Sequence, residues 1–161
     1  MLKKLETIEQ VYPLVKDDPV RPRLAADWRM KQGREVYALY DDQYAEQDPV
    51  LFDGPRAVIC VAYTNGVALT EKDLERCDNP NTAMFYTVWS YDKGAGRQIV
   101  NEVASHIKQS REDIGRFVTL SPLTEMAERF HLRNGAVFLR KGTLCQNFEY
   151  PAINNTQGEP V

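Results

Sequence analysis

The residues of this chain that could do chemistry gather in its last third. Ser121 ends a strand-like apolar run, and His131 follows ten positions later, ahead of an Asn-Gly pair. Histidine is the one side chain whose unperturbed pKa lies near neutral pH, and the chain has only two. Brought together at the end of a sheet, the two side chains could hold a carboxylate and move a proton. Each has a plain alternative: Ser121 suits a strand-ending Ser-Pro turn, and His131 a half-buried position near a helix C-terminus.

Residues that could hold an anion lie in mid-chain, around Lys93-Gly-Ala-Gly96. Backbone N–H groups there, at the positive end of the following helix dipole, would face a phosphate, and Lys93 and Arg97 add positive charge. Glycines before a helix also suit a tight turn, so the spacing leaves both interpretations open. Trp89, at a strand end, is more typical of a core residue. Asn134 could donate to a ligand carbonyl, but it also fits a turn.

Alternating helices and strands must position these residues. Apolar spacing predicts helices over 3–16, 24–32, 70–76, 97–110 and 124–130, with Pro13 interrupting the first and Thr124 capping the last. β-prone runs predict strands over 35–40, 57–63, 82–90, 117–121, 136–140 and 144–150. Residues 57–63 are apolar throughout, which is typical of a central strand buried on both faces. The acidic stretch 41–55 and the polar residues after Pro151 are predicted loops.

Length, composition and net charge favour some classes of protein and exclude others. A chain of 161 residues with 27% charged side chains is expected to form one globular domain. Its net charge of −3 and the lack of a basic stripe argue against nucleic acid as the main partner. The cysteines are too widely spaced for a zinc site or a disulfide framework. With neither a signal peptide nor the roughly 18 apolar residues of a membrane span, we expect a cytoplasmic protein.

The order of these elements resembles that of the acyl-CoA N-acyltransferase (GNAT) fold, an α/β (α+β) architecture with a central mixed sheet flanked by helices. Phe117-Val-Thr-Leu-Ser-Pro122 resembles the F-x-T-L-S-P stretch of malonyl-CoA decarboxylases. Arg129-Phe-His-Leu-Arg-Asn-Gly-Ala136 resembles their F-H-L-x-N-G-A stretch. Three further blocks match in family order: Arg56–Ala68, Asn81–Tyr86 and Asn147–Tyr150.

The resemblance implies a carbon–carbon lyase of fatty acid metabolism that converts malonyl-CoA, or a related malonyl thioester, to acetyl-CoA and CO2. It implies that Ser121 holds the departing carboxylate and that His131 protonates the carbanion. A backbone N–H near Thr87 to Ser90 would stabilise the enolate oxygen. No metal or organic cofactor is required, because CoA is part of the substrate. The implied substrate- and CoA-binding residues are Trp89, Ser90, Gly94, Gly96, Arg97, Asn134 and Tyr150.

The chain also departs from the family. Residues 1–34 form only a short helical segment where the family has a large helical domain; residues 35–150 would be the catalytic domain and 151–161 a loose tail. Leu123–Arg129 alone joins two motifs that a longer insert separates in the family. The glycine segment keeps Gly96 and Asn101 of a richer family loop, and Phe148 replaces a family tyrosine. An acyl-carrier protein could therefore present the malonyl group, and a homo-oligomer is a further expectation.

Two other functions stay open at this point. One is GNAT-type transfer of an acyl group from CoA to an amine, in which Tyr150 could stand near the thiolate. The other is a catalytically inactive CoA- or protein-binding module. The reduced glycine segment favours that module, whereas the presence of both Ser121 and His131 disfavours it.

Overall fold

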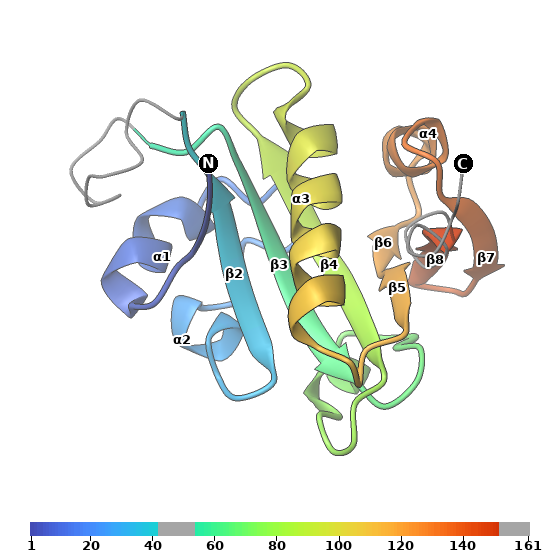
Figure 1. Cartoon of the computed structure of the whole chain (residues 1–161). Helices are drawn as coiled ribbons and strands as arrows, with labels where there is room; N and C mark the ends of the chain where they lie inside the picture. The colour runs from blue at the N-terminus through green and yellow to red at the C-terminus, as the bar shows by residue number, and fades with distance from the viewer. Residues whose placement is uncertain (42–53, 152–161) are drawn as a thin grey trace. The chain divides into compact units, whose positions relative to one another are not determined.

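A computed structural model describes residues 1–41 and 54–151, which form a mixed β-sheet flanked by helices (Figure 1). Hydrogen bonding orders the strands β1-β2-β3-β4-β5-β8-β6, with β7 paired to β8. The strands are β1 (Leu2–Lys4), β2 (Arg34–Leu39), β3 (Ala57–Thr64), β4 (Thr82–Ser90), β5 (Arg116–Thr119), β6 (Ser121–Pro122), β7 (Val137–Lys141) and β8 (Cys145–Glu149). The helices are α1 (Ile8–Val15), α2 (Ala26–Arg29), α3 (Ala95–Ser110) and α4 (Glu125–Arg133), with a 3-10 turn η3 (Lys72–Glu75).

The chain divides into two compact units. Unit 1 comprises Met1–Val61 and Thr87–Val103, and unit 2 comprises Ala62–Tyr86 and Ala104–Val161. The strands β3 and β4 and the helix α3 contribute residues to both. The predicted division into residues 1–34, 35–150 and 151–161 stays a prediction, and residues 42–53 and 152–161 of the predicted loop and tail lie outside the described residues.

The N-terminal helix of unit 1 is shorter than the sequence predicts. The predicted helix over 3–16 is wrong at its start, because Leu2–Lys4 instead forms β1, antiparallel to β2, with Leu2 opposite Leu39. The helix α1 begins only after Thr7, whose side chain accepts from the Gln10 N–H in a capping box. Pro13 lies inside α1 and does not end it. A three-residue strand leaves no periodic signal in the sequence, since its partner lies far along the chain.

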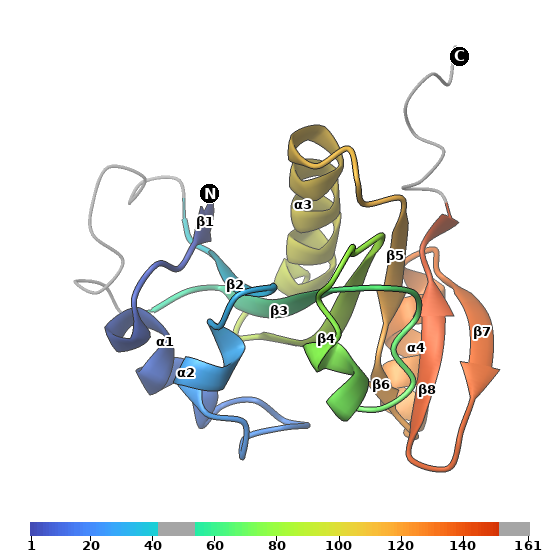
Figure 2. The ribbon, with the colours of Figure 1, turned by 90° about the horizontal axis from the view of Figure 1, so that it is seen from below.

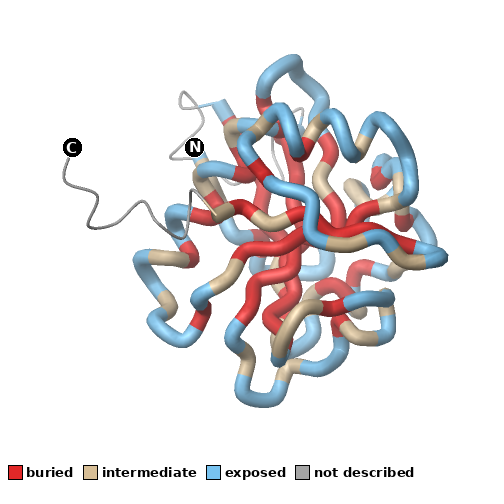
Figure 3. Tube along the Cα trace, turned by 90° about the vertical axis from the view of Figure 1, so that its right-hand side faces the viewer, coloured by how far each residue is buried: buried red, intermediate tan, exposed pale blue. Residues whose placement is uncertain are grey.

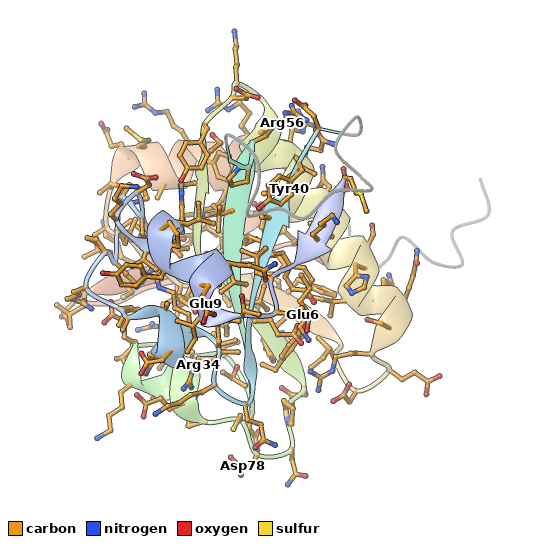
Figure 4. All side chains as sticks on the ribbon, turned by 90° about the vertical axis from the view of Figure 1, so that its left-hand side faces the viewer. Glu6, Glu9, Arg34, Tyr40, Arg56 and Asp78 are labelled. Carbon is orange, nitrogen blue, oxygen red and sulfur yellow. The ribbon has the colours of Figure 1, made fainter. Side chains whose placement is uncertain are left out.

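Unit 1 is layered around β2 and β3. The helices α1 and α2 lie on one face of these strands and α3 on the other (Figure 2). Every residue of β3 is buried, as predicted for a central strand. Buried segments, coloured red, alternate with exposed ones along the trace (Figure 3). The ladder continues past β2, where the Tyr40 N–H donates to the Met1 carbonyl at 2.8 Å and the Arg56 N–H to the Leu39 carbonyl at 2.6 Å (Figure 4).

A buried ion pair crosses the interior of unit 1. The Arg29 Nη1 lies 2.8 Å from the Asp18 Oδ2, and both side chains are fully buried. The rest of the guanidinium donates to the carbonyls of Leu24 and Arg21, at 2.8 and 2.6 Å. The Thr87 hydroxyl donates to the second Asp18 oxygen at 3.0 Å. The charges are thus matched by hydrogen bonds on several sides, as a buried ion pair requires.

In unit 2 the predicted strand over 117–121 is divided in two. The strands β4 and β5 pair in parallel as far as Phe85 opposite Thr119, while β4 runs on to Ser90. The Leu120 N–H donates to the Phe85 carbonyl at 3.0 Å. After Leu120 the chain pairs with β8 instead, with Ser121 opposite Gln146. Ser121 therefore begins β6 at the point where the chain changes its partner strand.

The predicted helix over 124–130 is confirmed in type and start, and it runs on to Arg133. Thr124 caps α4 by accepting from the Ala127 N–H at 3.2 Å, as its position predicts. The extension places His131 in the last turn of the helix, which contacts β6 and β7. The strand β7 pairs antiparallel with β8, with an irregularity between Phe138 and Arg140.

Candidate functional site

The first group of candidate residues surrounds His131 in unit 2. The His131 Nδ1 lies 2.7 Å from the Tyr150 hydroxyl oxygen, and both residues are buried, with 7% and 2% of their surface exposed. The imidazole stacks on Phe148, with ring centroids 5.6 Å apart, and meets Phe130 edge-on at 5.0 Å. This apolar burial lowers the pKa of His131 to about 4, so the ring is neutral near pH 7.

Asn134 completes this group. Burial raises the pKa of the Tyr150 hydroxyl, and the Asn134 amide lies close enough to that oxygen to offset part of the rise. The amide nitrogen is itself buried and makes no hydrogen bond within the described residues. The buried Tyr150 phenol keeps its hydrogen, and the His131 Nδ1 is its hydrogen-bond partner in the described residues, so the Tyr150 hydrogen is assigned to Nδ1. This assignment leaves the imidazole hydrogen on Nε2, which has no protein partner in the described part of the chain.

Ser121 has a different hydrogen-bond partner. Its hydroxyl oxygen lies 2.8 Å from that of Thr119, and the two residues are 3% and 0% exposed. The Thr119 oxygen also accepts from the Phe148 N–H at 3.1 Å. Within the described residues no hydrogen bond joins Ser121 to His131 directly. Phe148 connects the two sites, because its backbone binds Thr119 while its ring stacks on His131.

The second group of candidates lies at the N-terminal end of α3 in unit 1. Gly94 has a φ of +83°, which favours glycine, and the helix begins at Ala95, two residues earlier than predicted. Gly96 is therefore a buried residue of the first turn and not part of the preceding loop. That turn has no acidic residue, although acids are favoured there. The exposed side chains of Lys93 and Arg97 make no ion pair within the described residues.

These features suit an anion at the start of α3. Asp92, an acid next to this turn in sequence, has its carboxylate 3.1 Å from the Arg56 Nε. Arg56 also donates to Gln98 in the helix at 3.2 Å. The Ala95 and Gln98 N–H groups already donate to the carbonyls of Asp92 and Gly94, each at 3.2 Å. The other first-turn N–H groups have no helical acceptor, so an anion placed there would meet those donors and positive charge.

The remaining predicted residues, Trp89 and Ser90, end β4 in unit 1. Trp89 is 7% exposed, and its indole N–H donates to the Tyr91 hydroxyl at 3.0 Å. Tyr91 in turn donates to the Asp17 carboxylate at 2.7 Å. The side chain of Trp89 is thus committed within unit 1, whereas Ser90 is exposed.

The predicted site residues are therefore distributed over both units. Unit 2 brings together His131, Asn134 and Tyr150, with Ser121 linked through Phe148. Unit 1 holds the other five: Trp89, Ser90, Gly94, Gly96 and Arg97. Sequence reasoning missed Thr119 as a partner of Ser121, although a two-residue spacing on a strand places both side chains on one face.

Metal ligands do not gather in the described part of the chain. No three His, Cys, Asp or Glu side chains there lie close enough to hold an ion. None of the three cysteines, all of which the structure describes, forms a disulfide, and Cys60 is buried, as predicted. Across residues 1–41 and 54–151 no helix combines the length and apolar character that a membrane crossing needs.

The likeness to known proteins is one of fold. No protein-family model matches the sequence, and no curated protein matches it. Malonyl-CoA decarboxylase from Agrobacterium vitis superposes with a TM-score of 0.69 at 16% identity over 99% of this chain. This chain spans 63% of the length of that protein.

Two GNAT structures match at similar scores. The GNAT domain of S. lividans PAT has a TM-score of 0.61 at 11% identity, over 92% of this chain and 88% of its own. AtaTR bound with acetyl-CoA has a TM-score of 0.61 at 13% identity, over 97% and 96%. The chain therefore has the GNAT fold, as the order of its predicted elements indicates. Its fold neighbours include a malonyl-CoA decarboxylase, a GNAT domain and a protein bound with acetyl-CoA.

Proposed function

We propose that the chain binds an acyl thioester of coenzyme A and removes CO2 from a malonyl group on it. The observation that carries the proposal is the placement of two buried groups around Phe148 of β8. One is the Ser121 hydroxyl, held by Thr119, and the other is the His131 imidazole, held by Tyr150. Decarboxylation needs a group that orients the carboxylate and a group that protonates the carbanion.

Ser121 suits the first role. The bond between the carboxylate carbon and the α-carbon breaks, and its electron pair moves onto the thioester carbonyl to give an enolate. A neutral hydroxyl orients the carboxylate without the strong ground-state stabilisation that a cation would add. Ser121 is only 3% exposed. Its shielding from water favours conversion of the charged carboxylate to neutral CO2.

His131 suits the second role. Because the ring is neutral near pH 7, the proton it delivers to the α-carbon is the hydrogen on Nε2. As that hydrogen leaves, the Tyr150 hydroxyl supplies its proton to Nδ1, so the ring stays neutral. The buried Asn134 amide nitrogen, which makes no hydrogen bond within the described residues, is available to the resulting phenolate until solvent restores the proton. No metal or organic cofactor enters these steps.

The thioester and nucleotide ends of the substrate are assigned on other grounds. The start of α3, with Gly94, Gly96 and Arg97, suits the phosphates of coenzyme A. The resemblance of the sequence motifs to those of the decarboxylases supports assigning the enolate oxygen to a backbone N–H near Thr87 to Ser90. Both assignments are part of the proposal, as is a malonyl group presented by an acyl-carrier protein.

A second candidate function is transfer of an acyl group from coenzyme A to an amine. The observation that favours it is the protonated, buried hydroxyl of Tyr150, which could donate a proton to a leaving thiolate. A fold neighbour bound with acetyl-CoA adds support. The buried Ser121 hydroxyl has no role in this reaction, so we place it second.

The deciding experiment follows malonyl-CoA in D2O by mass spectrometry. The wild type is expected to form acetyl-CoA with solvent deuterium on the methyl group. Ser121→Ala and His131→Ala are each expected to lower turnover by at least about 100-fold. The matched controls are Ser110→Ala and His106→Ala, which change the same residue types at exposed positions of α3.

The alternatives give different products. Wild-type-like activity in both Ser121→Ala and His131→Ala would overturn the roles assigned to these residues. An amine acylated from acetyl-CoA, with malonyl-CoA left intact, would establish the transferase instead. Binding of malonyl-CoA without any product would point to a binding module.

A further inference from the structure

We propose that Thr119 is a positioning residue for Ser121. Its hydroxyl donates its hydrogen to the Ser121 oxygen, so that the hydrogen of Ser121 stays available for a carboxylate on the acyl group of the substrate. The inference deepens the proposed function and rests on it for the identity of that carboxylate. The two hydroxyl oxygens lie 2.8 Å apart, a normal hydrogen-bond distance.

The direction of this hydrogen bond follows from the partners of Thr119. A threonine hydroxyl has one hydrogen to donate and two lone pairs to accept with. One lone pair accepts the Phe148 N–H at 3.1 Å. Thr119 is fully buried, and Ser121 is the other partner of its hydroxyl in the described residues. Whichever hydroxyl donates, the other keeps a hydrogen that has no acceptor in the described residues. Thr119 has no exposed surface and Ser121 has 3%, so we assign the donor to Thr119 and the available hydrogen to Ser121.

Ser121 is then left with an unused donor. Its oxygen accepts from Thr119, and its own hydrogen has no acceptor among the residues that the structure describes. Ser121 is 3% exposed, so this donor is largely shielded from bulk water. A carboxylate supplies the acceptor that the protein lacks, whereas an acetyl methyl group does not. The pair thus favours an acyl group that ends in a carboxylate.

The backbone around this pair is fixed on both sides. The Asn147 amide donates to the Thr119 carbonyl at 2.7 Å and to the Ala68 carbonyl at 3.0 Å. Arg140 donates to the oxygen of the same amide at 3.2 Å, which sets its orientation. The Leu120 N–H binds the Phe85 carbonyl. Rotation of the Ser121 hydroxyl is therefore the remaining freedom, and Thr119 restricts it.

The test compares Thr119→Val, which removes the hydroxyl at nearly constant shape, with Thr119→Ser, which keeps it. The matched control is Thr82→Val, because Thr82 is also fully buried and donates to Asn81 at 2.7 Å. For each variant we would measure kcat and KM for malonyl-CoA, the inhibition constant of acetyl-CoA, and the thermal unfolding midpoint.

Thr119→Val is expected to lower kcat/KM for malonyl-CoA by about 10- to 100-fold, the range for a displaced reacting group. The inhibition constant of acetyl-CoA should stay unchanged, and Thr119→Ser should recover most of the activity. Thr82→Val should lower the unfolding midpoint about as much as Thr119→Val does, but it should leave kcat/KM for malonyl-CoA at the wild-type value. Should Thr119→Val not fold, Thr119→Ala replaces it, since the smaller side chain leaves room for a water on the Phe148 N–H.

Two results would overturn the role of Thr119 while leaving the proposed function intact. One is wild-type kcat/KM in Thr119→Val, and the other is a Thr119→Ser variant as impaired as Thr119→Val. If the wild type releases no CO2, the proposed function fails, and calorimetry then compares the binding of malonyl-CoA and acetyl-CoA. A preference for malonyl-CoA that both Thr119→Val and Ser121→Ala abolish would sustain the inference. A wild type without that preference would refute it.

Discussion

The Tyr150 hydroxyl and the His131 Nδ1 lie 2.7 Å apart in a part of unit 2 that is shielded from solvent. Burial favours the neutral form of each group, so the contact joins a phenol to a neutral imidazole and is not an ion pair. Proton transfer through such a pair does not require either group to be charged before the reaction begins. The pair therefore links the burial of this cluster to the protonation step of the proposed reaction.

Replacing Tyr150 by phenylalanine removes the hydroxyl and keeps the ring. The ring contacts Phe85, with centroids 6.4 Å apart, so stability should change by only about 1 kcal/mol, the net value of one hydrogen bond. Turnover of malonyl-CoA should fall by about 10- to 100-fold, because His131 loses the group that sets its tautomer. Tyr37→Phe is the matched control, since its hydroxyl binds Glu35 at 2.8 Å in unit 1. An unchanged kcat in Tyr150→Phe would contradict the proposed proton transfer from Tyr150 to His131.

The lowered pKa of His131 predicts a stability change with pH. Its pKa is about 4 in the folded protein against 6.5 as the ordinary value, so the unfolded chain binds the proton more tightly. The resulting stabilisation is complete above pH 6.5 and is lost as the pH falls towards 4. Its full size is about 3 kcal/mol, from 1.4 kcal/mol per pKa unit.

The measurement is urea unfolding of the wild type and His131→Gln between pH 7 and pH 4.5. The other acidic groups titrate in both proteins. The difference between the two proteins in how their unfolding free energy changes with pH is therefore the contribution of His131. The wild type should lose more stability on acidification than the variant does. Parallel curves for the two proteins would mean that His131 is not held neutral by the fold.

Much of the fold follows from local sequence signals. The strand β4 spans Thr82–Ser90 as predicted, because its β-prone run is long and bounded by loop residues. Thr124 caps α4 as predicted, because a threonine just before a helix can accept a hydrogen bond from an N–H of the first turn. The strand β1 could not be predicted, since its three residues become a strand only by pairing with β2. Local signals therefore serve for long elements and fail for those that a distant partner creates.

The candidate site could be predicted only in part. The residue types of Ser121, His131, Asn134 and Tyr150 suggested chemistry, but their hydrogen-bond partners depend on how β8 packs against α4. His131 and Tyr150 are nineteen residues apart, and no local pattern joins them. The sequence paired Ser121 with His131, whereas the structure gives each its own hydrogen-bond partner, and Phe148 contacts both Thr119 and His131.

The exposed Arg97 provides a test of the anion site at the start of α3. Arg97→Glu should weaken binding of coenzyme A by about 10-fold or more, the value of one charge-assisted hydrogen bond. The same change should not lower the unfolding midpoint, because an acid in the first turn stabilises a helix by about 0.3–1 kcal/mol. Calorimetry measures whether coenzyme A binds more weakly, and thermal unfolding measures whether the midpoint stays at or above that of the wild type.

The matched control for Arg97→Glu is Arg129→Glu, an identical charge change at an exposed position of α4. It should leave coenzyme A binding within experimental error at moderate salt. Equal weakening by both variants would indicate a general charge effect. Unchanged binding in Arg97→Glu would remove the start of α3 from the proposed substrate site.

The buried pair of Arg29 and Asp18 should make the largest contribution to stability among the ion pairs described. Arg29→Met leaves the Asp18 carboxylate buried without its cation, and breaking such a pair costs about 3–5 kcal/mol. Lys4→Met is the surface control, since Lys4 lies 3.1 Å from Glu35 with 44% of its side chain exposed. That exposed pair should contribute no more than about 1 kcal/mol. Urea unfolding of the two variants checks the difference, and equal losses would mean that water or rearranged donors compensate Asp18 inside unit 1.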